Sequence, residues 1–146
     1  MEDQSVSLTN TLISLDNPVF YTYALTSAIM ILKLMLQPWM TVYRMMKVNG
    51  GFRSPEDIKK SPLNREPKEG QLELNEYVDR SRRLNLNDLE SIPGFLAAGF
   101  LFVCSNPPLL LAQILLWIYV ISRAAHFIAY STAQLHMPAK IRLLRW

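Results

Sequence analysis

The sequence predicts an all-α integral membrane helical bundle with three transmembrane helices. Half of its 146 residues are hydrophobic, which excludes an intrinsically disordered chain. The charges are segregated, because 19 of the 27 charged residues lie between Arg44 and Glu90. The 32 residues from Ser91 to Ser122 carry no charge. An uncharged stretch of this length does not fit the core of a small soluble domain and is typical of a membrane protein.

The first transmembrane helix is predicted over about residues 17–46. Its apolar part, Val19 to Tyr43, is longer than the roughly 20 residues that a bilayer requires and contains a single charge, Lys33. Lys33 is expected to extend its ammonium group toward the cytosolic side of the membrane. Pro38 removes one helical hydrogen bond, so a kink is expected there.

A polar loop outside the membrane is predicted over about residues 47–78. It contains a glycine pair, three prolines and many Lys and Glu residues. Within it, Ser54-Pro55-Glu56-Asp57 has the features of a helix start, with Ser as N-cap, Pro at the first position and acidic residues in the first turn. One short helical turn is therefore expected inside the loop.

The long uncharged stretch is divided by Asn106-Pro107-Pro108, a strong helix break. It predicts two antiparallel helices over about residues 79–105 and 108–134, followed by a short tail at 135–146. The whole chain, residues 1–146, is then one membrane domain of ordinary size. Because the loop carries most Lys and Arg residues, the loop and the C-terminus are expected in the cytosol, with the N-terminus and the hairpin tip across the membrane.

Several protein classes are excluded by composition. The net charge of +3 is small and locally balanced, which argues against a nucleic-acid partner. A single cysteine, Cys104, excludes an internal disulfide framework and a cysteine-based zinc site, and no metal site is predicted. The first sixteen residues contain no basic residue, so the first hydrophobic segment is not expected to be a cleaved signal peptide.

Two polar stripes interrupt the apolar helices at one depth. Counted from the turn at ~1.5 Å per residue, Glu90 lies about 24 Å away and Arg123 about 22 Å away. Each stripe lies on one helix face with i, i+3/i+4, i+7 spacing, and the two sets are Arg83, Asn87 and Glu90, and Arg123, His126 and Tyr130. Arginine, amide, carboxylate and phenol groups suit a small polar ligand that carries several charges.

Simpler interpretations of the same residues remain open. Glu90 can pair with Arg123, and Asp88 with Arg82 or Arg83, as contacts that hold the helices together. Three residues near the start of the second helix can belong to a solvated interfacial face, namely Asp79, Arg80 and Arg82. His126 can be a packed histidine, and His136 and Cys104 can be structural.

Three segments resemble motifs of a known family. The stretch from Val78 to Ile92 resembles the pattern V-E-R-x-x-R-x-x-x-N-D-x-E-x-I, Phe52 to Asp57 resembles F-x-N-P-E-D, and Arg123 to Tyr130 resembles R-x-x-H-x-x-A-Y. On these motifs the chain is identified as a member of the MAPEG family, the membrane-associated proteins in eicosanoid and glutathione metabolism. Its second-helix motif is most similar to the family's glutathione transferases and next to its prostaglandin E synthases.

The resemblance implies a four-helix subunit that forms a homotrimer in the endoplasmic reticulum membrane, with the mitochondrial outer membrane as a further location. It also implies glutathione as the co-substrate, held at subunit interfaces toward the cytosol. The residues that the resemblance assigns to glutathione binding are Arg44, Arg83, Asn87, Glu90, His126 and Tyr130.

The resemblance also implies an arginine after the third helix that stabilises the glutathione thiolate. The corresponding segment here is Pro138-Ala139-Lys140, with Arg142 two residues later. The catalytic candidates are therefore Lys140, Arg142 and Tyr130. The motif departs from the family pattern at Asp79 and Asn85, where the family has Glu and His. The residues after Pro138 are too few for a fourth membrane helix, so the family fold is expected with three of its four helices.

The activity implied by the resemblance is that of a membrane-bound glutathione transferase or peroxidase. Such an enzyme activates glutathione as a thiolate, conjugates it to lipophilic electrophiles in detoxification, or reduces lipid hydroperoxides. Two alternatives remain: a glutathione-dependent prostaglandin E synthase, and a truncated, catalytically impaired subunit that associates with full-length partners. The expected partners are the lipophilic substrate, membrane lipid and two further copies of the chain.

Overall fold

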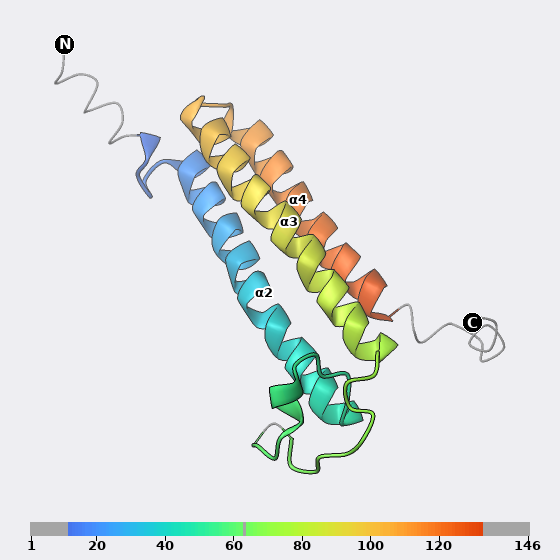
Figure 1. The fold of residues 1–146 in the computed structure, drawn as a ribbon. Helices are drawn as coiled ribbons and strands as arrows, with labels where there is room; N and C mark the ends of the chain where they lie inside the picture. Colours follow the sequence, from blue (N-terminus) through green and yellow to red (C-terminus); the bar gives the residue numbers. More distant parts are fainter. Residues whose placement is uncertain (1–11, 63, 133–146) are drawn as a thin grey trace. The chain divides into compact units, whose positions relative to one another are not determined.

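The structure is a computed structural model that describes residues 12–62 and 64–132. Within these ranges it is all-helical, with α2 (Pro18–Val48), the 3-10 turn η1 (Pro55–Ile58), α3 (Glu76–Cys104) and α4 (Leu109–Thr132) (Figure 1). The three α helices are each long and apolar enough to cross a membrane. The prediction of a membrane helical bundle with three transmembrane helices is confirmed.

Helix α2 is capped by an asparagine at each end. The Asn17 Oδ1 accepts a hydrogen bond from the Val19 amide at 2.9 Å, and Pro18 occupies the first helical position, where its missing N–H costs nothing. At the other end Asn49 has a positive φ of 47°, while the amides of Asn49 and Gly50 bond back to the carbonyls of Met46 and Met45. This is a Schellman-type ending. The helix continues through Pro38 without interruption.

Helix α3 begins earlier than the sequence predicted. Its N-cap is Asn75, whose Oδ1 accepts hydrogen bonds from the amides of Tyr77 at 3.1 Å and Val78 at 3.3 Å. This start places Glu76 and Asp79 in the first turn of the helix. Acidic side chains there interact favourably with the positive end of the helix dipole. The predicted start near Asp79 was therefore about one turn too late. The predicted break at Asn106-Pro107-Pro108 does separate α3 from α4.

The chain divides into two compact units. The hairpin unit contains described residues 12–32 and 90–132, and the loop unit contains residues 33–62 and 64–89. In the hairpin unit, Val19, Val103 and Ala112 form a buried apolar cluster. Beside it the Tyr23 hydroxyl donates to the Leu96 carbonyl at 2.8 Å, which attaches the first part of α2 to α3.

In the loop unit, side-chain amides hold the connection between α2 and α3. Asn64 and Gln71 are almost fully buried, and the Asn64 Nδ2 donates to the Gln71 Oε1 at 2.8 Å. The Gln71 carbonyl in turn accepts the Phe52 amide at 2.9 Å. The predicted helical turn is present as η1, although the Ser54 side chain makes no cap hydrogen bond. These contacts fix the backbone on either side of Arg53.

Candidate functional site

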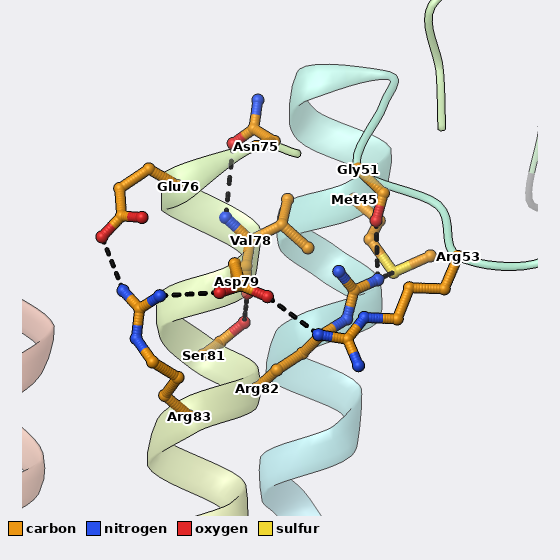
Figure 2. Close-up of polar contacts among 10 residues, drawn as sticks. All are labelled: Met45, Gly51, Arg53, Asn75, Glu76, Val78, Asp79, Ser81, Arg82 and Arg83. Atoms are coloured by element: carbon orange, nitrogen blue, oxygen red, sulfur yellow. Dashed lines mark hydrogen bonds and ion pairs between the residues drawn. The ribbon is translucent and has the colours of Figure 1, made fainter. Parts of the chain in front are cut away.

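A network of charged side chains lies at the start of α3 (Figure 2). The Asp79 carboxylate accepts the Arg53 Nη2 at 3.0 Å and the Arg83 Nη1 at 2.6 Å. Arg83 also donates through its other terminal nitrogen to Glu76 at 2.5 Å. Because Arg53 belongs to the loop and Arg83 to α3, Asp79 joins the loop to the helix.

Arg82 secures the loop from the neighbouring position on α3. Its Nη2 donates to the Gly51 carbonyl at 2.6 Å (Figure 2). Gly51 has a φ of +73°, and a Cβ on it would approach the Val78 side chain to 3.1 Å, so glycine is required for this close approach. Asp79 is buried, at 8% exposure. The interpretation of Asp79 and Arg82 as a solvated interfacial face is therefore wrong, because both hold the loop against α3.

A cavity of about 370 Å³ opens beside this network in the loop unit. It combines guanidinium groups with an apolar wall, and it is lined by Pro38, Thr41, Arg53, Asp79, Arg82, Arg83, Asn85, Leu86 and Leu89. A volume of this size falls within the range of small-molecule sites. The cavity can accept a ligand that has both an anionic group and an apolar part.

A second ionic contact, in which the carboxylate is fully buried and the ammonium group largely so, lies elsewhere in the loop unit. Asp88 has no exposed surface and accepts hydrogen bonds from the Lys33 ammonium and the Gln37 side-chain amide. The alternative pairing of Asp88 with Arg82 or Arg83 is therefore wrong. The expectation that Lys33 extends its ammonium group toward the cytosolic side of the membrane is also wrong, because that group binds Asp88. Desolvation explains both outcomes, since a carboxylate at this depth requires the nearest available cation.

The predicted ligand-binding face of α3 is directed outward from the single chain. Arg83, Asn87 and Glu90 are all exposed, as their i, i+4, i+7 spacing on one helix face requires. The face therefore offers a guanidinium, an amide and a carboxylate in order along the helix. Of these three, Arg83 also lines the cavity.

The polar stripe on α4 belongs to the hairpin unit. His126 and Tyr130 are half-buried, and their rings stack with centroids 5.7 Å apart. The His126 Nδ1 is buried and has no hydrogen-bond partner among the described residues. A buried ring nitrogen without a hydrogen-bond partner is uncommon in folded proteins, so His126 is an unsatisfied polar group beside Tyr130.

The remaining predicted site residues have other surroundings. Arg44 is buried at 6% exposure, donates to the Tyr77 carbonyl at 3.0 Å and lies 4.5 Å over the Tyr77 ring. It therefore faces the beginning of α3 and does not line the cavity. Lys140 and Arg142 lie outside the described residues.

Sequence reasoning missed the contributions of Arg53 and Asp79 to the cavity. One sequence feature could have indicated the role of Arg53, which follows a glycine pair and Phe52. A tight turn at the glycine pair can direct the chain back toward the next helix. The loop unit brings Arg83 together with both residues, whereas Glu90, His126 and Tyr130 belong to the hairpin unit. Among residues 12–62 and 64–132, no group of three or more His, Cys, Asp or Glu residues could hold a metal ion.

Comparison with known proteins gives one family and a consistent set of relatives. The sequence model of the MAPEG family matches residues 22–146. Microsomal glutathione S-transferase 1 of Rattus norvegicus is 36% identical over 118 residues, which cover 81% of this chain and 75% of that protein. The Sus scrofa protein of the same name is 36% identical over 80% of this chain and 74% of its own length. The Homo sapiens protein of the same name is 34% identical over 81% of this chain and 75% of its own length.

No solved structure gives a significant match. The family match covers most of the chain, and the relatives carry the name of the class that the second-helix motif resembles. The predicted resemblance is confirmed, and the chain belongs to the MAPEG family.

Proposed function

We propose that this protein is a membrane-bound glutathione transferase that conjugates glutathione to lipophilic electrophiles and reduces lipid hydroperoxides. The observation that carries the proposal is the exposed polar face of α3, formed by Arg83, Asn87 and Glu90. Ionisable side chains within membrane-spanning helices are costly in lipid and face a ligand, water or another subunit. The names of the relatives, microsomal glutathione S-transferase 1, support glutathione as that ligand.

The chemistry of glutathione matches the three side chains. Glutathione is a tripeptide with two carboxylates, one ammonium group, two amides and a thiol. The Arg83 guanidinium suits a carboxylate through paired N–H donors, the Asn87 side chain suits an amide, and the Glu90 carboxylate suits the ammonium group. The face would therefore hold glutathione by charge and hydrogen bonding at the edge of the apolar layer.

Activation of the thiol is assigned to other groups. A free thiol has a pKa of about 8.5, so a nearby cation or hydrogen-bond donor increases the thiolate fraction at neutral pH. Tyr130, Lys140 and Arg142 are the proposed donors, with His126 and Arg44 as further binding groups. The stacked arrangement of His126 and Tyr130 supports a defined orientation of the Tyr130 ring.

Each reaction uses the same thiolate. In conjugation, the sulfur attacks an electrophilic carbon, a carbon–sulfur bond forms, and a halide or similar group leaves with the bonding electrons. In peroxide reduction, the sulfur attacks the terminal oxygen, the oxygen–oxygen bond breaks, and the alkoxide takes a proton. The resulting sulfenic acid reacts with a second glutathione, which gives the disulfide and water.

The proposal predicts a specific effect of Arg83→Ala. Loss of a charged hydrogen bond of about 1.5–3 kcal/mol should raise the glutathione Kd by roughly tenfold or more. The measurement is a glutathione titration of the purified protein in detergent, with conjugation of 1-chloro-2,4-dinitrobenzene as a second readout.

The matched control is Arg65→Ala, which removes an arginine from an exposed loop position that does not line the cavity. Its glutathione Kd should be unchanged. If the wild-type protein shows neither thiolate absorbance nor conjugation, the enzyme proposal is wrong. If Arg83→Ala binds glutathione as the wild type does, Arg83 is a structural residue.

Assembly and location extend the same proposal. A homotrimer in the endoplasmic reticulum membrane would shield the exposed charges of α3 from lipid, because a neighbouring copy covers the face. Native mass spectrometry of the detergent-solubilised protein measures the number of copies. A stable monomer that turns over glutathione would reject the trimer and leave the activity intact.

A further inference from the structure

The Arg83 side chain, which the proposed function assigns to a glutathione carboxylate, already binds two carboxylates of its own chain (Figure 2). Its Nη1 donates to Asp79 at 2.6 Å, and its Nη2 donates to Glu76 at 2.5 Å. Glu76 precedes Arg83 by two helical turns and so lies on the same face of α3. A ligand carboxylate that approaches Arg83 must therefore compete with acidic groups of the protein.

The geometry of the guanidinium makes Nη2 the critical nitrogen. A carboxylate can accept two N–H groups at once either end-on, from Nη1 and Nη2, or side-on, from Nε and Nη2. Each arrangement includes Nη2, where Glu76 is bound. A second carboxylate at this nitrogen would lie beside that of Glu76, and the two like charges would repel. Glu76 therefore opposes paired binding of a ligand carboxylate to Arg83.

The two acidic partners of Arg83 differ in how easily they can be released. The Asp79 side chain is 11% exposed and also binds Arg53 at 3.0 Å. Removing a cation from a buried carboxylate is costly. The Glu76 side chain is 49% exposed, so water can solvate its carboxylate, and an exposed ion pair is weak. Glu76 is therefore the partner that a ligand can displace.

We propose that Glu76 lowers the affinity for glutathione by competing for Arg83. The glutathione carboxylate takes the place of Glu76 at Nη2, while Asp79 stays bound to Nη1 and keeps the guanidinium oriented. Arg83 thus exchanges one acidic partner for another when glutathione binds. This inference rests on the proposed function, because it concerns the residue assigned there to the glutathione carboxylate.

The test is a double-mutant cycle on glutathione binding, measured by titration of the purified protein in detergent. Glu76→Gln removes the charge and keeps the size of the side chain. It should lower the glutathione Kd about threefold, the effect expected when an exposed ion pair no longer has to be broken. In an Arg83→Ala background, the same substitution should change the Kd by less than about 1.5-fold, because the competition requires Arg83.

The matched control is Glu73→Gln, which removes the same charge from an exposed position three residues before Glu76. Its glutathione Kd should equal that of the wild type. A kinetic measurement with 1-chloro-2,4-dinitrobenzene gives a second readout. The effect of Glu76→Gln should appear in the KM for glutathione rather than in kcat, since Glu76 acts on binding.

Each other result has a definite meaning. A higher Kd in Glu76→Gln would overturn the inference, because Glu76 would then hold Arg83 in its binding orientation. An equal decrease in the Arg83→Ala background would also overturn it, because the charge would then act without Arg83. An unchanged Kd in Glu76→Gln, with saturable binding by the wild type, rejects the competition and leaves the transferase in place. If neither protein binds glutathione, the proposed function is wrong and the competition is rejected with it.

Discussion

At the scale of single residues, Lys33 and Asp88 show how a membrane protein accommodates buried charge. The Lys33 side chain is 16% exposed and the Asp88 side chain is not exposed at all. Gln37 adds a second donor to the same carboxylate. A charge removed from water at this depth is tolerated when it is paired and hydrogen-bonded. The contact therefore joins α2 to α3 inside the loop unit.

Replacement of Lys33 by methionine should be strongly destabilising. The variant Lys33→Met leaves the Asp88 carboxylate buried without its cation, and breaking a buried pair in this way costs about 3–5 kcal/mol. A clear decrease in Tm is expected in detergent, measured by thermal unfolding followed by circular dichroism.

The double variant Lys33→Met/Asp88→Leu should recover much of the lost stability, since no unpaired charge remains. Lys60→Met, at an exposed loop position, should leave the Tm unchanged. Equal Tm values for Lys33→Met and the wild type would show that the contact contributes nothing to stability.

The sequence did not predict which basic residue binds the Asp88 carboxylate. The depth of Asp88 was predictable from its distance to the turn, but its partner was not. Arg82 and Arg83 are closer in sequence, yet Arg83 binds Glu76 and Asp79 and Arg82 binds the Gly51 carbonyl. Lys33 comes from another helix, and only packing decides which residue of α2 faces Asp88.

At the scale of the elements, local chemistry sets the helix ends. Asn17, Asn49 and Asn75 each terminate a helix through a side-chain acceptor or a left-handed backbone. The turn between α3 and α4 followed directly from two adjacent prolines. The start of α3 was less predictable, because several polar residues before Asp79 can serve as N-cap and only Asn75 has the right geometry.

Two glycines of α3 should respond differently to alanine. A Cβ at Gly99 would lie 2.9 Å from the Tyr23 Cε2, and Tyr23 cannot move away without losing its hydrogen bond to the Leu96 carbonyl. Overpacking of this kind costs about 1–3 kcal/mol. Gly99→Ala should therefore lower the Tm.

Gly94→Ala is the matched control in the same helix, because nothing lies within 4 Å of its added Cβ. Alanine is the better helix former by about 1 kcal/mol, so the Tm should stay the same or rise. Thermal unfolding of both variants in one detergent gives the comparison. An unchanged Tm in Gly99→Ala would contradict the close packing of α3 against Tyr23.

At the scale of the whole molecule, the transmembrane topology is open to a direct test. Cys104 is the single cysteine of the chain, it is exposed, and it ends α3 next to the predicted hairpin tip. If the loop is cytosolic, as its Lys and Arg content predicts, a membrane-impermeant maleimide should label Cys104 only after sealed microsomes are permeabilised.

The matched variant moves the thiol to the loop. In a Cys104→Ser background, Glu69→Cys places a cysteine at an exposed loop position, and it should react without permeabilisation. The reverse pattern, with Cys104 labelled in sealed microsomes and the loop cysteine protected, would reverse the topology.

The sequence by itself determined the helical class, the three membrane-spanning segments, the position of the hairpin turn and the family. Each depends on local composition or on short motifs, which act within one helix or one turn of chain. The tertiary structure decided that Asp88 binds Lys33, and that Asp79 binds both Arg53 and Arg83 beside a cavity. These contacts join residues from separate elements, and their energies depend on burial and distance that arise only when the elements pack.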